Sequence, residues 1–353
     1  MTFISTVGFF GAQLVNDVLT DTIVVAIGRY KTQFDAAYCR RSKMSDDKFF
    51  TDLTATTSLG QAASTVLARR LQSVRHYLSK AVEKPGKNPE DVHDLRVATR
   101  RATAALGVFG PLLDADLYRK ARNVLRQTRR CAGSIRDLDV FLARLDTVQP
   151  NAPCAPGIYA IAGYCIARRH MCQQALVSLR EDLSSTLEKV HKRLSRAHSY
   201  ASARQTLGAW AQKQVPLFVS EVQQAAAGDL RRPEQLHALR VAGKHLRYAM
   251  EVFAGCYPPV WIAQLYARVG TMQEILGALN DTQMALRFVQ EFTQASQHYA
   301  RSFAKKCRPG CLYLRRLFAA QAKEQTKTFR QFWKTWQKEN VLERIRRTVA
   351  VVA

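Results

Sequence analysis

Two stretches of the sequence repeat a pattern of side chains that could hold an anion. In each stretch a histidine is followed three residues later by an arginine and seven residues later by a second cation. Residues at these spacings share one face of a helix. Arginine and lysine pair with phosphate oxygens, and histidine adds a hydrogen bond together with charge when it is protonated. The candidate anion-binding residues are His93, Arg96, Arg100 and Arg101 in the first stretch and His237, Arg240, Lys244, Arg247 and Tyr248 in the second.

The two stretches are copies of one unit. The segment PEDVHDLRVATRR at 89–101 returns as PEQLHALRVAGKH at 233–245, an offset of 144 residues, and seven of the first ten positions are identical. The same offset relates Gly133 to Gly277 and Asp137 to Asp281. A repeat of this length predicts two similar structural halves.

Each copy is predicted to form an amphipathic helix that begins at a proline, a residue that the first helical turn tolerates. A solvated surface is the usual fate of cations on a helix. The reuse of one charged pattern in two otherwise diverged copies indicates a functional stripe instead. The opposite, apolar face is predicted to be core and consists of Leu95, Ala98, Ala102, Ala105, Leu106 and Phe109 in the first copy and Leu239, Ala242, Leu246, Ala249, Met250 and Phe253 in the second.

A further cationic face is predicted on the helix that follows the first copy. Residues 118–133 place five arginines on one side with almost no acid between them, so a bound anion explains that side better than solvent does. These residues are Arg119, Arg122, Arg126, Arg129 and Arg130. Gly133 is expected to let two backbones approach closely, and Ser134 to open another helix that carries Arg136.

The acidic residues beside these cations are expected to be structural. Asp137, and Asp281 with its neighbour Asn280, lie where the next helices are predicted to begin. There the carboxylates could cap those helices or brace nearby arginine and lysine side chains. Asp137 and Asp139 form an acid pair, but no second acidic cluster completes a two-metal site. We therefore expect no metal site and no cofactor.

The amino-acid composition indicates which kinds of molecule the protein could bind. The chain has 353 residues, with 53 Lys and Arg against 28 Asp and Glu, a net charge of +25. Such a charge attracts polyanions, so the candidates are nucleic acid, an anionic membrane surface and inorganic polyphosphate. Hydrophobic residues make up 47 %, and no segment alternates as a strand does, which predicts an all-α fold with a large core. The eight cysteines lack disulfide-framework or CxxC spacing, which indicates reduced thiols in a cytoplasmic protein.

The main domain is expected at residues 60–340, with a first half at 60–150, a linker and long helix at 151–202, and a second half at 203–340. Residues 1–59 are an N-terminal segment, of which 1–43 read as an appendage or a misassigned start. Asn16, Asp17 and Asp21 interrupt the apolar residues at 3–27, so the longest uninterrupted apolar run is too short to span a membrane. Residues 341–353 are expected to be a tail. Pro309 and Gly310 are expected to mark a turn between helices at 282–304 and 311–338.

Known catalytic motifs are missing from the sequence. It contains no P-loop, no GxSxG, no HExxH and no Glu-x-Glu-x-Lys pattern of a triphosphate-hydrolysing tunnel. A metal or phosphotransfer site built on His93 and His237 is disfavoured, because the arginines one turn away would repel a metal ion. The sequence therefore predicts a binding protein and not an enzyme.

The motifs HDLRVATRR with GSIRDLDV, and HALRVAGKHLRYAMEVF with LGALND, resemble the two halves of a CHAD domain (conserved histidine α-helical domain) over about residues 60–340. The resemblance implies two helical bundles related by a pseudo-twofold axis, with a basic cavity or groove between them. It also implies binding of inorganic polyphosphate and, as in some relatives, association with polyphosphate or polyester storage granules. Many relatives carry a fused triphosphatase domain, which this chain lacks, so hydrolysis is not expected.

The signature positions of the family match the two histidine-led stripes, with Arg136–Asp137 and Asn280–Asp281 as the later motif. His245 stands where relatives usually carry Lys or Arg, which could make one contact sensitive to pH. The leading hypothesis is non-catalytic binding of polyphosphate, and the alternative is a nucleic-acid-binding protein. Binding single-stranded nucleic acid favours exposed aromatic side chains on which bases stack. Here most aromatics fall at core-like positions, namely Phe109, Phe253, Phe288 and Phe292.

Overall fold

The computed structural model describes residues 48–83, 88–195 and 205–351. Within these residues the fold is all-α and contains no strand, as predicted. The helices are α2 (Leu59–Glu83), α3 (Pro89–Phe109), α4 (Ala115–Asp146), α5 (Ala155–Ser178), α6 (Arg180–Leu194), α7 (Leu207–Ala226), α8 (Pro233–Val252), the short α9 (Pro259–Trp261), α10 (Ala267–Tyr299), α11 (Arg301–Lys338) and α12 (Val341–Val351). In this described part, no helix is both long and apolar enough to cross a membrane.

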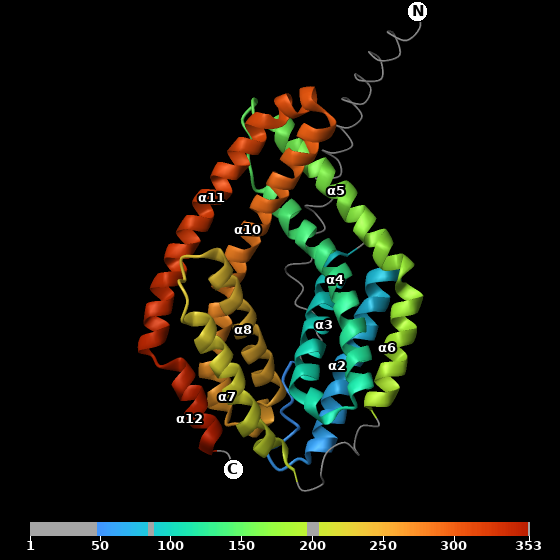
Figure 1. Cartoon of the computed structure of the whole chain (residues 1–353), viewed down its shortest axis with the longest axis vertical. Coiled ribbons are helices and arrows are strands. Elements are labelled where there is room, and N and C mark those ends of the chain that lie inside the picture. Colours follow the sequence, from blue (N-terminus) through green and yellow to red (C-terminus); the bar gives the residue numbers. More distant parts are fainter. Residues whose placement is uncertain (1–47, 84–87, 196–204, 352–353) are drawn as a thin grey trace, which may run out of the picture.

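The helices form two groups that meet at both ends of the molecule (Figure 1). In one group α3 packs against α2 and α4, and α6 packs against α2 and α4. In the other group α8 packs against α7 and α10, and α12 packs against α7. The groups touch through α3 and α8 at one end, while α4, α5, α10 and α11 converge at the other.

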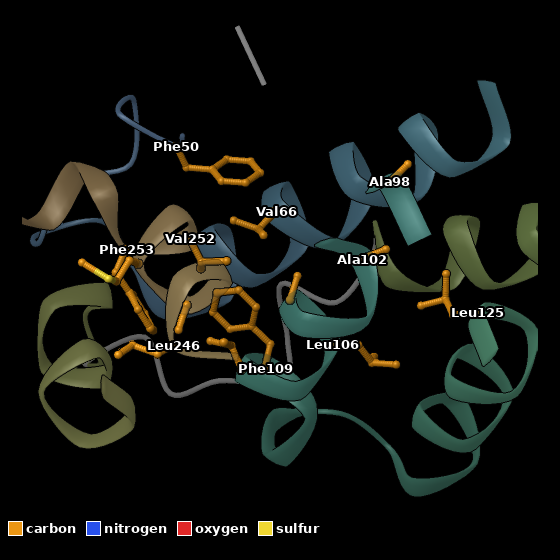
Figure 2. Close-up of a cluster of buried hydrophobic side chains, with 14 of the residues drawn as sticks. Phe50, Val66, Ala98, Ala102, Leu106, Phe109, Leu125, Leu246, Val252 and Phe253 are labelled. Atoms are coloured by element: carbon orange, nitrogen blue, oxygen red, sulfur yellow. The ribbon is translucent and has the colours of Figure 1, made fainter. Parts of the chain in front are cut away.

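Two hydrophobic cores hold this arrangement together. The larger core contains residues of both groups, and Figure 2 shows Leu106 and Phe109 of α3 beside Leu246 and Val252 of α8. Every residue that was predicted for the two apolar helix faces is buried, including the equivalent pair Phe109 and Phe253. The smaller core fills the end where α4, α5, α10 and α11 converge. The two groups are therefore joined by shared apolar packing at both ends.

Both repeat helices begin at the predicted proline. The N-terminus of α3 is capped by Asn88, whose side chain accepts a hydrogen bond from the backbone of Glu90. The N-cap of α8 is Arg232, whose side chain makes no capping hydrogen bond. Proline at the first position fixes the start of both helices and thereby the direction of both charged stripes.

Three predicted breaks are wrong. Gly133 and Gly277 lie inside the continuous helices α4 and α10, so no new helix begins after either glycine, contrary to the prediction. Pro309 and Gly310 lie inside α11, which runs without interruption from Arg301. A proline inside a helix costs about 3 kcal/mol, which packing against a neighbouring helix must offset. At Gly310 the backbone of α11 lies directly against Gly157 of α5, so the two helices cross closely beside the proline.

The ends of the described chain pack on the main core. Phe50 and Leu53, which precede α2, are buried. In residues 341–351, expected to be a tail, α12 buries Val341, Ile345 and Val349. The N-terminal residues 1–43 that the sequence singles out lie outside the described residues, as does Cys39. The seven cysteines within the described residues are all free.

Candidate anion-binding site

A pocket of about 630 Å³ lies between the two groups of helices. Four helices line it, and two of them carry the histidine-led stripes. The lining residues are Arg96, Arg100, Thr103, Ala104 and Gly107 of α3; Tyr118, Arg129, Arg130, Gly133 and Asp137 of α4; Phe218 and Glu221 of α7; and Val241, Lys244, His245 and Tyr248 of α8.

Arg96 is placed by two residues of α4. Its Nη1 atom lies 3.1 Å from a carboxylate oxygen of Asp137. A Cβ atom at Gly133 would lie only 2.9 Å from the same nitrogen, so the glycine leaves the room that the guanidinium occupies. Burial raises the pKa of Asp137, and the nearby Arg96 acts in the opposite direction. Asp137 therefore braces a cation, as predicted, but it caps no helix because it lies in the middle of α4.

Four cations from α3 and α8 lie close together beside the pocket. Burial lowers the pKa of Arg240, and the positive charges of Arg100 and Arg96 lower it further against the opposing effect of Asp281. Burial also lowers the pKa of Lys244 to about 6, with Arg240, Arg100 and Arg96 adding to the shift. A lysine in this state is largely neutral at pH 7 because no anion compensates its charge.

Several of these cations have unused hydrogen-bonding capacity. In the described part of the chain, the buried Nε atoms of Arg100, Arg240 and Arg247 make no hydrogen bond. The guanidinium of Arg247 also lies 5.2 Å from the ring centre of Tyr248, which belongs to the pocket lining. A buried donor without a partner costs free energy that a bound acceptor would recover. An anion with several oxygen atoms would supply acceptors for these donors.

The two predicted histidines lie beside the cationic cluster but not in the pocket lining. Burial lowers the pKa of His93 to about 3, and the charges of Arg136, Arg100 and Arg96 act in the same direction. His237 is exposed, and its pKa is also lowered by partial desolvation and by Arg240. Both imidazoles are therefore neutral at pH 7 and can contribute hydrogen bonds but little charge.

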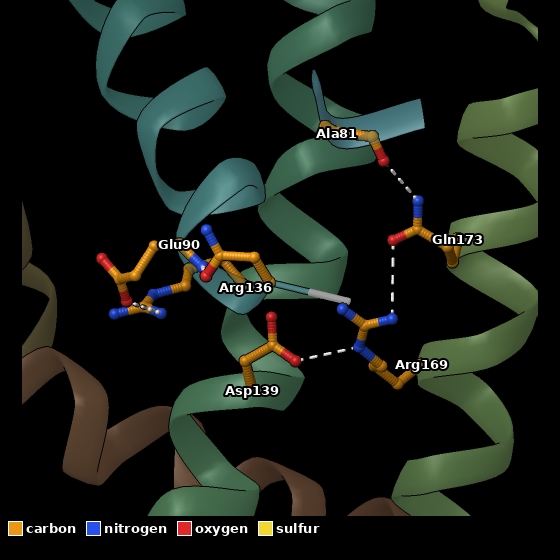
Figure 3. A network of polar contacts seen from close by, with 7 residues as sticks. Ala81, Glu90, Arg136, Asp139, Arg169 and Gln173 are labelled. Carbon is orange, nitrogen blue, oxygen red and sulfur yellow. Dashed lines mark hydrogen bonds and ion pairs between the residues drawn. The ribbon is translucent and has the colours of Figure 1, made fainter. Parts of the chain in front are cut away.

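Two predicted cations of the first half, Arg101 and Arg136, are already paired. Arg101 donates from Nε to Glu251 of α8 at 2.9 Å, and that carboxylate is fully buried. Glu251 also lies 3.8 Å from Arg70 and accepts a hydrogen bond from Tyr266. Arg136 lies 3.4 Å from Glu90, as Figure 3 shows. These contacts tie helices together and turn the two arginines away from the pocket lining.

Asp137 and Asp139 do not act as a pair. Asp139 is fully buried and accepts a hydrogen bond from Arg169 of α5 at 2.9 Å (Figure 3). Gln173 extends this network to the backbone carbonyl of Ala81. Side chains two residues apart point to different sides of a helix, so one aspartate serves the pocket and the other the packing of α5. No group of three His, Cys, Asp or Glu side chains that could hold a metal ion exists within the described residues.

The five α4 arginines that were predicted to form one cationic face divide into two sets. All five are exposed, and Arg129 and Arg130 line the pocket. Arg119, Arg122 and Arg126 extend along the same helix outside the lining, and Arg119 is paired with Asp116 at 2.9 Å. In the second half, Asp281 and Asn280 also lie outside the lining, and their side chains are 3.4 Å apart.

Sequence reasoning missed one contact at the edge of the pocket. Glu221 of α7 lies 3.1 Å from the Nδ1 atom of His245, and both residues line the pocket. Phe218, one turn before Glu221, lines the same wall. The segment that forms α7 carries no repeat motif, so nothing in its pattern linked it to the stripes. His245 was recognised only as a departure from a family pattern.

The sequence matches the CHAD domain over residues 65–290. The crystal structure of the CHAD domain from the plant Ricinus communis shares the fold, with a TM-score of 0.64 and 23 % identity over 79 % of this chain and 93 % of that one. PptA from Streptomyces chartreusis is also similar, with a TM-score of 0.59 and 16 % identity over 79 % of this chain and all of that one. No curated protein sequence matches the chain.

Proposed function

The chain belongs to the CHAD domain family, and on this premise we propose that it binds inorganic polyphosphate, without catalysis, in the pocket between α3, α4, α7 and α8. The family is known to bind polyphosphate. We also propose that the two helix groups are the halves of the sequence repeat, related by a pseudo-twofold axis. In that arrangement Arg96 and Asp137 correspond to Arg240 and Asp281.

The observation that carries this proposal is the concentration of buried positive charge beside the pocket, which neighbouring carboxylates offset only in part. Arg100, Arg240 and Arg247 each have a buried Nε donor without a partner within the described chain. The same cations lower the pKa of Lys244 to about 6, after the larger effect of burial. A polyanion would supply the missing acceptors and the missing charge at once.

Polyphosphate suits this arrangement better than a single small anion. Every unit of the chain carries anionic oxygens, and planar guanidinium groups pair with such oxygens at two points. The cations come from helices of both groups, so successive units of one chain can contact α3 and α8 together. No single contact needs to be strong, because many weak contacts add along the chain. Association with polyphosphate granules, which the family resemblance implied, would use the same chemistry.

A non-catalytic role is supported by the way the local carboxylates are used. Asp137 pairs with Arg96, and Glu221 lies beside His245. Metal-assisted hydrolysis needs several carboxylates or histidines that are free to hold ions. The two acids of the pocket lining are instead engaged with neighbouring basic side chains.

Nucleic acid is the competing ligand that an experiment must exclude. The aromatics named from the sequence, Phe109, Phe253, Phe288 and Phe292, are all buried and offer no surface for stacking bases. The most exposed large aromatic in the described chain is Tyr299, which does not line the pocket. The pocket lining does contain Tyr118, Phe218 and Tyr248, so competition by RNA must be measured directly.

Calorimetric titration with long-chain polyphosphate, with RNA as competitor, tests the proposal. The pocket variant combines Arg100→Ala with Lys244→Ala, and the control combines Arg122→Ala with Arg126→Ala on the exposed side of α4 outside the lining. Both remove two positive formal charges. We expect the pocket variant to lose affinity by about tenfold or more and the control by much less, because truncating buried charged contacts costs a few kcal/mol. Equal losses, or equal competition by RNA, would show a general polyanion binder with no preferred site.

A further inference from the structure

Helix α11 carries a second concentration of positive charge. Residues 301–338 contain eleven Lys and Arg and a single acid, Glu324, so this one helix has a net charge of +10 out of the +25 of the whole chain. Ten of the eleven cations fall within a sector of roughly 140° when residues are placed at 100° intervals around the helix. We call this set the α11 stripe: Arg301, Lys305, Arg308, Arg315, Arg316, Lys323, Lys327, Arg330, Lys334 and Lys338.

The α11 stripe faces solvent along its whole length. All ten side chains are exposed, whereas the opposite side of α11 buries Cys307, Leu314 and Phe318 in the smaller core and Phe329 and Trp336 in the larger one. The 38 residues of the helix span about 57 Å at 1.5 Å per residue. The stripe is therefore a row of cations that extends along the whole helix and not a local patch.

Almost nothing neutralises this charge. Among the described residues, Lys327 is the only stripe member with a carboxylate oxygen within 4.0 Å, that of Glu324 at 3.8 Å. Most neighbouring stripe cations are separated by roughly 6 Å or less along the axis, which is less than the Debye length of about 8 Å at physiological ionic strength, and the two larger gaps, before Arg315 and before Lys323, are roughly 10 Å. The cations therefore repel one another, and the helix persists because its other side is buried. A bound polyanion would remove this repulsion.

The stripe is separate from the pocket. No residue of α11 lines the pocket, whose walls come from α3, α4, α7 and α8. Helix α11 packs against α10 and α5, and it runs along the outer edge of the molecule (Figure 1). A chain bound in the pocket and a chain bound on the α11 stripe would not compete for the same side chains.

The dimensions of the pocket indicate which polyanion the stripe would meet. A volume of 630 Å³ corresponds to a cube with an edge of roughly 9 Å, so the pocket holds only a short segment of a long polyphosphate chain. The rest of that chain lies outside and is available to exposed cations. The exposed aromatic residues of α11, Phe303 and Tyr313, lie outside the angular sector of the stripe, so the stripe lacks the stacking platforms of a surface for single-stranded nucleic acid.

We propose that the α11 stripe is a second polyphosphate-binding surface, so that one molecule holds two segments of polyphosphate at once. This inference rests on the proposed function of the pocket. Two segments of one chain would bind more tightly than either alone, because the second contact is intramolecular. Two different chains would be cross-linked, which gives the protein a means of condensing polyphosphate.

Three variants with three readouts test the inference. The stripe variant carries Lys323→Gln, Lys327→Gln and Arg330→Gln. Glutamine keeps the helix propensity close to that of lysine and arginine. The control carries Arg180→Gln, Lys189→Gln and Lys192→Gln on the exposed side of α6 and has the same net charge. The pocket variant is Arg100→Ala with Lys244→Ala.

The three readouts are the affinity for a short oligophosphate, the salt dependence of long-chain binding, and light scattering by mixtures of protein and long chains. Circular dichroism checks that each variant is folded.

We expect the stripe variant to bind the short oligophosphate as the wild type does. Its light scattering with long chains should fall severalfold. The magnitude of the slope of log affinity against log salt concentration should fall by roughly two to three, because each lost phosphate contact lowers that slope by somewhat less than one. The pocket variant should lose short-chain binding and keep weak, salt-sensitive binding of long chains. A stripe variant that matches the α6 control in every readout would overturn the second surface and leave the pocket proposal intact. Loss of short-chain binding in the stripe variant, with none in the pocket variant, would overturn the pocket and the claim of two sites together.

Discussion

Arg96 occupies the space into which a side chain at position 133 would project. A Cβ atom on Gly133 would lie 2.9 Å from Nη1 of Arg96, and the same nitrogen lies 3.1 Å from Asp137. A glycine in a helix interior costs about 0.5–1 kcal/mol relative to alanine. In α4, Gly133 carries this cost in stability and leaves room for the Arg96 guanidinium at the pocket.

Gly133→Ala should therefore separate stability from binding. Alanine favours the helix, and the end of the flexible Arg96 side chain can shift away from the new methyl group. We expect the free energy of unfolding to stay within about 1 kcal/mol of the wild type. The higher helix propensity of alanine stabilises the fold, and the displacement of the Arg96 side chain offsets this effect. Polyphosphate affinity should fall by about tenfold, the equivalent of one charge-assisted hydrogen bond. Urea denaturation and calorimetric titration measure the two quantities.

Gly277→Ala is the matched control. Gly277 is equivalent in sequence and lies inside α10, but a Cβ atom there would meet nothing within 4 Å. We expect it to stabilise the fold by about 0.5–1 kcal/mol and to leave affinity unchanged. Similar affinities for the two variants would show that the position of Arg96 does not matter for binding.

Binding should take up protons at Lys244. Its pKa in the free protein is lowered to about 6, first by burial and then by Arg240, and a bound polyanion would raise that pKa. Affinity should therefore increase as pH falls from about 8.5 to 6 and level off below the free pKa. Titrations in two buffers with different ionisation enthalpies measure the proton uptake. Arginine at position 244 stays charged over this pH range, and methionine there is never charged. Lys244→Arg and Lys244→Met should therefore both lose the pH dependence of affinity that comes from Lys244.

The same residue gives a prediction for stability without ligand. The folded pKa of Lys244 lies below its ordinary value of 10.5, so between pH 6 and 10.5 the unfolded chain binds more protons at this position. Its contribution to the free energy of unfolding must therefore become more favourable as pH rises through that window. Lys244→Met should flatten this slope, as measured by urea denaturation from pH 6 to 9. An unchanged slope would mean that Lys244 is not desolvated as the structure indicates.

Glu251 should be essential for stability. Its carboxylate is fully buried, lies 2.9 Å from Arg101 and 3.8 Å from Arg70, and accepts a hydrogen bond from Tyr266. Glu251→Gln would leave two arginines facing a neutral amide, and breaking a buried ion pair on one side costs about 3–5 kcal/mol. Glu234→Gln removes an exposed carboxylate from the same helix and should cost less than about 0.5 kcal/mol. Equal unfolding free energies for the two variants would contradict this role.

The crossing of α5 and α11 should tolerate no added methyl group. A Cβ atom on Gly157 would overlap the backbone carbonyl oxygen of Cys307, which cannot move aside without shifting α11. We expect Gly157→Ala to destabilise the fold by about 1–3 kcal/mol, as overpacking does, despite its better helix propensity. Gly270→Ala in α10, where the added atom would meet nothing within 4 Å, should stabilise the fold slightly. Thermal unfolding of the two variants provides the comparison.

The elements with strong periodicity could be predicted from the sequence, and the helix breaks could not. The apolar faces of α3 and α8 follow directly from spacing, and all their predicted members are buried. Glycine and proline suggested turns at Gly133, Gly277 and Pro309, but all three lie within helices. Local sequence does not reveal the long-range contacts at two of these positions, namely the approach of Arg96 to Gly133 and, beside Pro309, the close packing of Gly310 on Gly157.

The charged stripes were visible in the sequence, but their contacts were not. Spacing placed Arg96 and Arg101 on or beside one charged face of a helix. The structure directs Arg96 to the pocket and Arg101 to the buried Glu251, which lies 150 residues away in the chain. Glu221 carries no motif and could be found only from the packing of α7 on α8. Helical periodicity assigns a side chain to a face, and only tertiary packing determines what that face meets.

The most direct test is a crystal structure of the protein with a short oligophosphate. The account predicts phosphoryl density in the pocket, with oxygen atoms within hydrogen-bond distance of Arg100 and Arg96 and of the Nζ atom of Lys244. Density confined to other surfaces, with the pocket filled only by water, would contradict the central claim.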